Sequence, residues 1–276
     1  MKSHLSHIRA RLRDYWRRLR NTGYFRQSES SALSRRIAEN DIDFIWAEAC
    51  LLYDKPEKLT THDSDHIVQF GPRVMPIFNA AQRELLIASP YFIPGDAGCT
   101  WMIDKQNSDV DIKVLTNSLA ATDVPVVHAG YSQYRERLLK NGISLFELKR
   151  DAITRKLHSR LLMPYRSHAS LHAKYIVIDR RQVLIGSANI DPRSSNLNTE
   201  IAITIDSEVL AEQVSALFEQ TAEPGKSYQL GLSGNKLVWH TLKQGNKLHY
   251  RHDPDTSLLK RLFVYLVGLL PIESLL

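Results

Sequence analysis

The sequence predicts an α/β fold, in which a mixed, mostly parallel sheet carries helices on both faces. Three observations support this. Short apolar runs alternate with amphipathic segments between residues 72 and 222, the pattern of strands spaced by helices. A chain of 276 residues can bury a sizeable core, as one large domain or two small ones. Its 43% hydrophobic and 24% charged residues are ordinary for a globular protein.

The N-terminal segment, residues 4–20, predicts a basic amphipathic helix. Apolar side chains recur at helical spacing, with arginines between them. Such a helix can lie on a membrane surface, where arginine suits anionic headgroups. We favour an ordinary surface helix that packs on a neighbouring domain. The segment lacks the apolar region of a secretory signal, and no stretch of the chain reaches the ~18 apolar residues of a spanning helix.

The next segment precedes the regular alternation. Residues 26–40 predict a loop or a short helix, and residues 44–53 predict one long strand or a pair of strands. The sequence His62-Asp63-Ser64-Asp65-His66 contains residue types that bind metals. We favour a polar loop, because no thiolate or third ligand follows nearby. We therefore expect no metal and no cofactor.

The alternation begins at Pro72. It predicts helices over residues 72–82, 97–107 and 126–141, the last with Tyr131, Tyr134 and Leu138 on one stripe, and strands over residues 84–88, 112–115 and 143–148. Ligands of such sheets sit beyond the strand ends. We expect Tyr91, Thr116-Asn117 and His172 to gather there.

A basic connection, residues 149–170, leads from this region into the most informative part of the chain. It contains Arg155, Lys156, Arg160 and Arg166. It could form an electropositive entrance for an anionic headgroup, or it could be a solvated loop. The sequence favours neither interpretation.

His172 and Lys174 lie two residues apart in an apolar, β-branched run that ends with residues 175–178 and predicts a strand. Because side chains alternate along a strand, both point to one face. An imidazole can attack phosphorus and carry the phosphoryl group covalently. An ammonium beside it neutralises the non-bridging oxygens, and a hydroxyl and an amide complete the cradle. The pattern predicts phosphoryl or phosphatidyl transfer through a phosphohistidine, with no metal needed.

The spacing of the residues that follow makes this signal specific. Asp179 closes the strand, a polar turn leads to a second strand over residues 183–185, and Gly186 allows a close backbone approach. Ser187 and Asn189 come next. A bare His-x-Lys pair is weak, but the full array of His-x-Lys, Asp and Gly-Ser-x-Asn rarely arises by chance.

Together these residues resemble the HKD motif of the phospholipase D superfamily. Residues 89–94, 116–118 and 171–174 are similar to the C-terminal half of bacterial cardiolipin synthases, especially the branch without N-terminal membrane spans. The resemblance runs from about residue 10 to the C-terminus. It implies a phospholipase D-like fold, a catalytic set and a substrate-binding set; the first is His172, Lys174 and Asp179, and the second is Ser187, Asn189 and Glu200.

The roles of two of these residues, Asp179 and Glu200, are open to more than one interpretation. Asp179 is expected to bond the turn rather than to touch substrate. Glu200 resembles the family's acidic residue that orients an active-site imidazole, but it could equally be a solvent-facing strand end.

The chain also departs from the family pattern. Members of that branch carry two HKD motifs, whereas this sequence shows one, since His62, His66 and His128 are not followed two residues later by lysine. The two-step reaction needs one imidazole as nucleophile and another as general acid and base. We therefore expect the second to come from another copy or from a separate HKD-bearing half, and an isolated monomer to be inactive.

The C-terminal region changes in character. Residues 201–205 predict a strand, and residues 207–222 predict a helix with Val209, Val214, Leu217 and Phe218 on its apolar side. Residues 257–270 are too short to span a membrane but apolar nearly all round. We favour contact with a membrane surface over a buried terminal helix.

Three regions are therefore expected. Residues 1–60 would be a helix, linker and strand left from a preceding half, residues 61–225 a catalytic domain, and residues 226–276 an extension with an interfacial segment.

The net charge of +6 favours anionic partners. We expect a phospholipid membrane, at the cytoplasmic face of the bacterial inner membrane, and no nucleic acid, because no nucleic-acid-binding motif is present. The resemblance implies a phosphatidyltransferase of the cardiolipin synthase type. The alternatives to this function are a homodimeric phospholipase D or nuclease, and an inactive half that binds a membrane or a partner.

Overall fold

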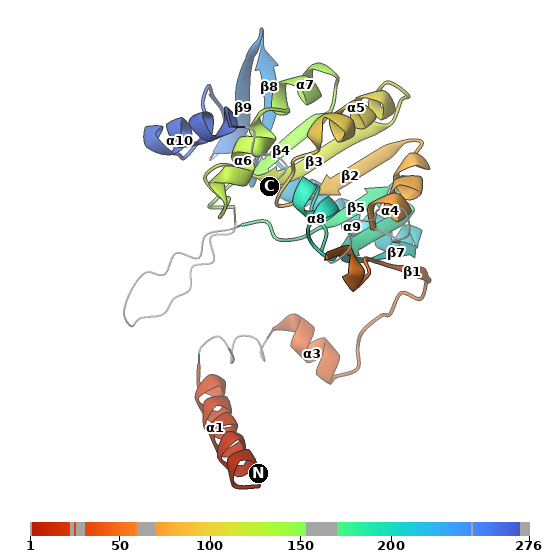
Figure 1. Cartoon of the computed structure of the whole chain (residues 1–276), viewed down its shortest axis with the longest axis vertical. Coiled ribbons are helices and arrows are strands. Elements are labelled where there is room, and N and C mark those ends of the chain that lie inside the picture. Colours follow the sequence, from red (N-terminus) through yellow and green to blue (C-terminus); the bar gives the residue numbers. More distant parts are fainter. Residues whose placement is uncertain are drawn as a thin grey trace. The chain divides into compact units, whose positions relative to one another are not determined.

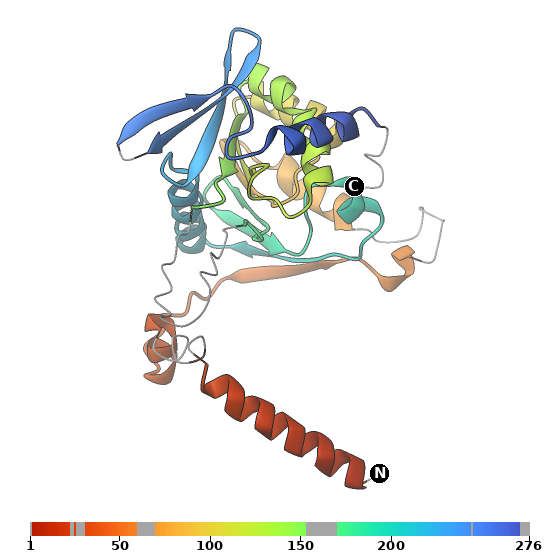
Figure 2. The same ribbon diagram turned by 90° about the vertical axis from the view of Figure 1, so that its left-hand side faces the viewer.

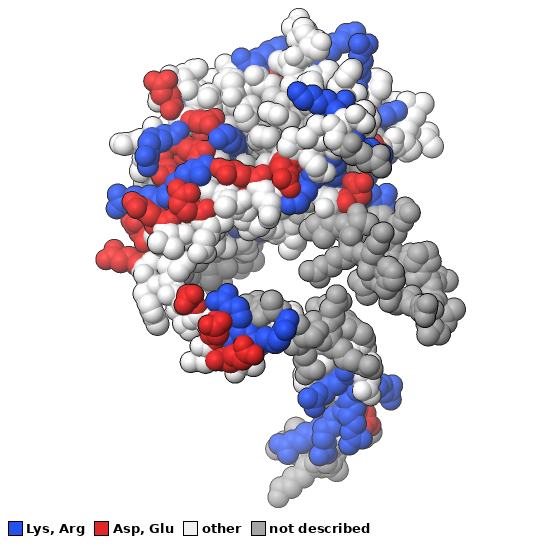
Figure 3. All heavy atoms as spheres, turned by 180° about the vertical axis from the view of Figure 1, so that it is seen from behind, with Lys and Arg blue, Asp and Glu red and all other residues white. Residues whose placement is uncertain are grey.

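The structure, a computed structural model, describes residues 2–22, 25, 31–59, 70–152, 170–243 and 245–270. The chain divides after Trp46 into two compact units. The first contains α1 (Lys2–Arg20) and α3 (Ala32–Ala38), so the N-terminal helix is confirmed. Leu12 and Trp16 of α1 are exposed within this unit, and basic side chains crowd the helix surface (Figure 3).

The second unit is built on a ten-stranded sheet of order β1-β7-β6-β5-β2-β3-β4-β8-β9-β10 (Figure 1). The strands are β1 (Glu48–Tyr53), β2 (Glu84–Ala88), β3 (Asp111–Asn117), β4 (Ser144–Leu148), β5 (Tyr175–Ile178), β6 (Gln182–Gly186), β7 (Ile201–Asp206), β8 (Ser227–Ser233), β9 (Lys236–Lys243) and β10 (Asn246–Tyr250). The predicted division at residues 60 and 225 stays a prediction.

The prediction of a mixed sheet is confirmed, but the expectation that parallel pairs dominate is wrong. Among the described strands only the pairs β2–β3 and β3–β4 are parallel. The motif itself is the reason: a three-residue turn joins β5 to β6 and forces them antiparallel. Strands β8 to β10, which the sequence did not predict, form an antiparallel meander whose tight turns contain Gly234 and Gly245, both at positive φ.

Helices cover both faces of this sheet, as predicted. One core cluster lies between the sheet and α4 (Phe70–Asn79), α5 (Gly95–Gln106), α6 (Pro125–Ser132) and α7 (Arg135–Lys140); the other lies under α9 (Glu208–Ala222). Strand β2 contributes to both clusters, because successive side chains of a strand point to opposite faces. Leu85 and Ile87 belong to the first cluster, and Leu86 and Ala88 belong to the second.

Two helix predictions need correction. The segment 126–141 forms two helices, α6 and α7, although its stripe of Tyr131, Tyr134 and Leu138 is buried as expected. In α9, Phe218 is buried, but Val209 and Leu217 are exposed. Three short elements complete the unit: η1 (Pro56–Leu59), α8 (Pro192–Asn196) and α10 (Leu258–Gly268).

Helix α10 lies against α6 (Figure 2). Val264 is buried with Leu119 and Ala129. Two hydrogen bonds anchor the helix: the Lys260 ammonium donates to the Leu119 carbonyl (2.6 Å), and the Gln133 amide donates to the Gly268 carbonyl (3.1 Å). None of the helices in the described parts of the chain has the length and hydrophobicity of a membrane span.

Candidate active site

The end of β3 holds the segment that carries His172. The backbone N–H of Leu171 donates to the Asn117 side-chain oxygen (2.8 Å), and the Asn117 amide donates back to the Leu171 carbonyl (3.1 Å). Thr116 donates to the Pro90 carbonyl (3.3 Å), which ties the loop before Tyr91 to the same strand end. The expected gathering beyond the strand ends is therefore present for Asn117 and the residue preceding His172.

His172 and Lys174 keep their reactive groups open. The His172 imidazole is exposed, and no side chain or backbone group in the described part of the chain bonds it. The half-buried Lys174 ammonium donates to the backbone carbonyl of His172 (3.0 Å). Ile176, two residues further along, packs in the cluster that faces α4 and α5. The alternation of side chains places Lys174 on that face.

Three carboxylates act on Lys174. Partial burial lowers the pKa of Lys174, and the negative charges of Glu200, Asp191 and Asp123 oppose that shift. Tyr91 donates to both oxygens of Asp123 (3.0 and 3.1 Å). Burial, together with this bond to Asp123, raises the pKa of Tyr91 to about 12. The lysine is therefore set among carboxylates contributed by three separate segments.

Ser187 and Glu200 are bonded to each other. The Ser187 hydroxyl donates to a Glu200 carboxylate oxygen and accepts from the Ile201 N–H (3.1 Å). Glu200 is buried, so the alternative of a solvent-facing strand end is wrong. Asn189 donates its backbone N–H to the Ser194 hydroxyl (3.1 Å), while its side-chain oxygen is buried without a partner among the described residues.

The residue that fixes Glu200 was not among the predicted site residues. Asp54 accepts the Glu200 N–H (3.0 Å) and forms a buried ion pair with Lys58 (2.7 Å). The same carboxylate accepts the Phe70 N–H (2.6 Å). In the sequence Asp54 only marks the end of a strand, and no local pattern signals a partner 146 residues away. Asp123 and Asp191, which act on Lys174, were not predicted either.

Asp179 is bonded to backbone. It adopts a left-handed conformation (φ 53°), and its carboxylate accepts the N–H groups of Gln82 (2.9 Å), Arg83 (2.7 Å) and Glu84 (2.9 Å). These bonds tie the β5–β6 turn to the start of β2. Burial acts to raise its pKa, but the three backbone hydrogen bonds and Arg83 hold the pKa below its usual value. These contacts agree with bonding of the turn, and a catalytic role for Asp179 stays a prediction.

Gly186 lets β6 approach β7 closely. A Cβ at this position would lie 2.4 Å from the Ile201 carbonyl oxygen and 2.5 Å from the Ala202 Cβ. Only glycine fits here, and the neighbouring Ser187 thereby comes within reach of Glu200.

A second cluster of ionisable residues lies elsewhere. His128, Glu147 and Asp253 place ligand atoms within 4.8 Å of one another. However, Arg135 donates to both Glu147 (3.2 Å) and Asp253 (2.9 Å). Its guanidinium already supplies the positive charge that a metal would bring, so the cluster is an internal ion-pair network. We call these four residues the carboxylate clamp. The His62–His66 segment lies outside the described residues.

Comparisons with known proteins place this geometry in a family. Residues 74–222, just over half of the chain, match the family model "Cardiolipin synthase, PLD-like domain". The chain is 38% identical to cardiolipin synthase C of Escherichia coli over 256 residues, which cover 92% of this chain and 53% of that protein. It is 31% identical to an uncharacterized protein of Helicobacter pylori, over 87% of this chain and 46% of that protein.

Among solved structures, the chain is similar to the phospholipase D family member Nuc of Salmonella typhimurium over 63% of this chain and 93% of that one. The identity is 16% and the TM-score is 0.45, too distant to support an argument about substrate. The chain spans about half the length of the curated relatives it matches. The matched region contains every residue from His172 to Glu200, and the chain therefore belongs to the cardiolipin synthase family of phospholipase D-like domains.

Proposed function

We propose that the chain is one half of a phosphatidyltransferase of the cardiolipin synthase type. It moves a phosphatidyl group between phospholipid headgroups through a phosphohistidine intermediate. The observation that carries this proposal is the open imidazole of His172 beside the Lys174 ammonium, which bonds only a backbone carbonyl among the described residues. Both groups are left available for a phosphodiester.

The reaction has two steps. A nitrogen of His172 attacks phosphorus, and the bond from phosphorus to the leaving alcohol oxygen breaks as a general acid protonates that oxygen. A second alcohol then attacks, gives its proton to the same group acting as base, and displaces the imidazole. Lys174 holds the non-bridging oxygens. Ser187 and Asn189 contribute a hydroxyl and an amide, and Glu200 positions Ser187.

The general acid is an imidazole from outside this chain's motif. His128 is buried in the carboxylate clamp and bonded to Asp253 (3.3 Å), so it cannot serve at the site as it lies. We propose that a second copy, or a separate HKD-bearing half, brings the second imidazole opposite His172. The chain's match to about half of its relatives' length supports this pairing.

We further propose that the protein works peripherally at the cytoplasmic face of the bacterial inner membrane, with α10 as its contact. Val264 anchors the inner side of α10, whereas Leu259 is 78% exposed and Tyr265 65% exposed. The outer apolar side chains are Leu258, Leu259, Leu262, Phe263, Leu266, Leu269 and Leu270. An exposed apolar helix surface of this kind is suited to the interface of a bilayer.

The first experiment measures phosphatidyl transfer on phosphatidylglycerol liposomes, with light scattering to count subunits. We expect transfer only in a dimer or after addition of a first-half polypeptide, and loss of transfer in His172→Ala. Transfer by a monodisperse monomer, abolished by His172→Ala, would refute the paired-half proposal. Release of phosphatidic acid without transfer would identify a phospholipase D instead, and cleavage of DNA or RNA a nuclease.

Membrane contact is tested by flotation with the same liposomes. Leu259→Glu on the outer side of α10 should weaken flotation by at least tenfold, because a charge enters the apolar interface. Val209→Glu on α9, where an apolar side chain is also more than half exposed (61%), is the matched control and should float like the parent. Equal flotation of all three proteins would rule out α10 as the contact.

A further inference from the structure

A cavity of about 470 Å³ lies between the sheet and the helices α4, α5 and α8. Strands β2, β5 and β6 form its floor, through residues such as Ile87, Ile176 and Leu184. Its volume is within the range of roughly 300–1,000 Å³ of small-molecule sites. The roles proposed above assign no function to this cavity, although Asn189 of the motif lines it.

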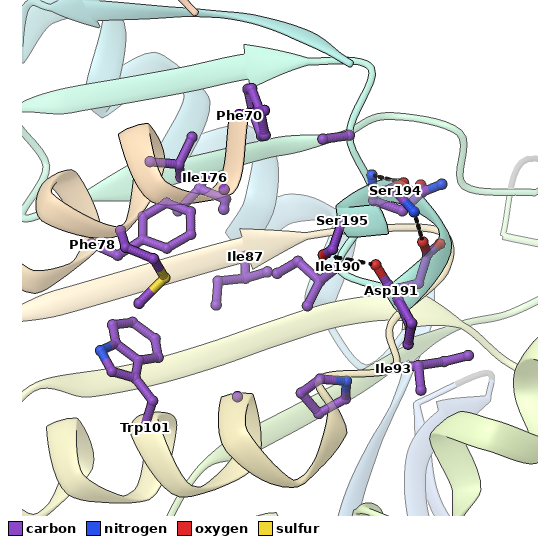
Figure 4. Close-up of a pocket in the computed structure, with 18 of the residues that line it drawn as sticks. Phe70, Phe78, Ile87, Ile93, Trp101, Ile176, Ile190, Asp191, Ser194 and Ser195 are labelled. Atoms are coloured by element: carbon purple, nitrogen blue, oxygen red, sulfur yellow. Dashed lines mark hydrogen bonds between the residues drawn. The ribbon is translucent and has the colours of Figure 1, made fainter. Parts of the chain in front are cut away.

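The cavity is apolar at one end and polar at the other (Figure 4). Phe78 and Trp101 lie at the apolar end, with their rings 6.0 Å apart. Asp191, Ser194 and Ser195 lie at the opposite end. No lysine, arginine or histidine is among the described residues that line it.

The polar end is continuous with the active site. Ile176 of the floor follows Lys174 by two residues on the same face of the strand. Ala188 and Asn189 of the motif line the cavity directly. Asp191 lines it too and is one of the three carboxylates that act on Lys174. A molecule with its phosphate at Lys174 can therefore extend an apolar portion into the cavity.

We propose that this cavity holds an acyl chain of the phospholipid whose phosphate is attacked by His172. The proposal rests on the proposed function for the identity of the substrate. The chemistry of the lining selects the occupant: a hydrocarbon needs no charged partner, whereas an anionic headgroup would find no cation here. The Asp191 carboxylate is already engaged, since it accepts the Ser194 N–H (2.6 Å). The cavity thus makes acyl-chain length a determinant of substrate choice.

Trp101 provides a direct measure of binding. It lines the apolar end, and its indole N–H donates to Asn79 (2.7 Å). A phospholipid with brominated acyl chains, kept below its critical micelle concentration, should quench the fluorescence of the parent protein saturably. Trp101→Phe should lose that saturable component, although Trp16, Trp46 and Trp239 remain. Saturable quenching that persists in full in Trp101→Phe, or its absence from the parent, would overturn the proposal.

Filling the cavity gives the second measurement. Gly71 lines it, and a Cβ added there meets no atom of the described residues within 4 Å. Gly71→Leu should raise the dissociation constant of the brominated lipid at least tenfold, and replacing a helical glycine favours folding. Gly225 has equally open surroundings outside the cavity, so Gly225→Leu is the matched control and should bind like the parent.

The two proposals fail in different ways. Quenching of Trp101 without phosphatidyl transfer in any assembly would refute the proposed function and leave the acyl site standing. Transfer with no preference for chain length, unaffected by Gly71→Leu, would refute the acyl site and leave the transferase standing.

Discussion

The second unit of the protein contains two clusters of charged residues, the carboxylate clamp and the active site, that share residue types but differ in how far their polar groups are hydrogen-bonded. In the carboxylate clamp, Arg135 bonds two carboxylates, and the Trp239 indole N–H donates to Glu147 (2.9 Å). In the active site the His172 imidazole is exposed and unbonded within the described chain, and the Lys174 ammonium bonds a backbone carbonyl. Buried polar groups in proteins are nearly always paired. The groups of the clamp are largely paired in this way, whereas the exposed His172 imidazole and the Lys174 ammonium keep bonding capacity that no described residue uses.

Electrostatics separates the two clusters in the same way. In the clamp, burial acts to lower the pKa of the Arg135 guanidinium, but Asp253 and Glu147 raise it well above its usual value. In the active site, burial lowers the pKa of Lys174 in spite of three carboxylates. In the clamp, burial also acts to raise the pKa of Asp253, but Arg135 and His128 hold that pKa below its usual value. Burial raises the pKa of Glu147. The active site instead leaves its lysine ready to interact with an added anion.

The largest expected contrast is between the two histidines. In whichever assembly shows transfer, His172→Asn should reduce the rate about a thousandfold or more, because the nucleophile is lost. It should change the free energy of unfolding by less than about 0.5 kcal/mol, since the side chain is exposed. His128→Asn should do the reverse, with near-normal transfer and a loss of about 1–3 kcal/mol in stability.

Transfer rates and urea unfolding curves measure both effects. Loss of transfer in folded His128→Asn would contradict the conclusion that the clamp is structural and only the active site is catalytic. It would also make His128 a candidate for the second imidazole.

The next effect is on stability alone. Arg135→Met leaves the buried Glu147 carboxylate and the partly buried Asp253 carboxylate without their cation, and we expect a cost of about 3–5 kcal/mol. Arg137 lies two residues further along α7 and pairs with the exposed Asp96. Arg137→Met is thus the matched control and should cost less than about 1 kcal/mol. Similar urea midpoints for the two variants would show that the clamp does not stabilise the fold.

Whether a feature of the two clusters could be predicted from the sequence depends on how far apart in the sequence its contacting residues lie. Strand β2 has the predicted limits, Glu84–Ala88, because alternation and turn residues are local signals. Strand β5 ends at Ile178 as predicted but begins only at Tyr175, so His172 and Lys174 precede the strand in which they were expected. The motif positions were likewise visible in one stretch. Their partners were not: Asp54 reaches Glu200 across 146 residues, and no short pattern encodes such a contact.

The missed C-terminal meander is a different case, because its signal was present. Gly234-Asn235 stands between two runs that form β8 and β9, and this pair is typical of a two-residue hairpin turn. The direction of β5 and β6 was also predictable, since a three-residue turn cannot connect parallel strands. The expectation of a mostly parallel sheet gave too much weight to the α/β alternation before the motif.

Asp179 tests whether bonding or motif membership decides a residue's role. It belongs to the motif, yet it is bonded like a member of the clamp, to three backbone N–H groups. We expect Asp179→Ala to cost about 2 kcal/mol in unfolding free energy, because three donors lose a charged acceptor. Transfer by the folded fraction should fall less than tenfold. A thousandfold loss of transfer at unchanged stability would assign Asp179 to the catalytic machinery instead.

The smallest effect is the acid dependence of that same carboxylate. Its pKa in the folded protein is lowered, because the backbone hydrogen bonds and Arg83 outweigh the effect of burial. A group with a lowered folded pKa contributes its full stability above the unfolded pKa of about 3.9, and loses it as the pH falls through the folded pKa. The difference in unfolding free energy between the parent and Asp179→Asn should therefore be constant from about pH 5 to 7 and shrink below about pH 4. Urea unfolding at a series of pH values measures it. A difference that stays constant down to pH 3 would show that the Asp179 charge contributes nothing to holding the turn.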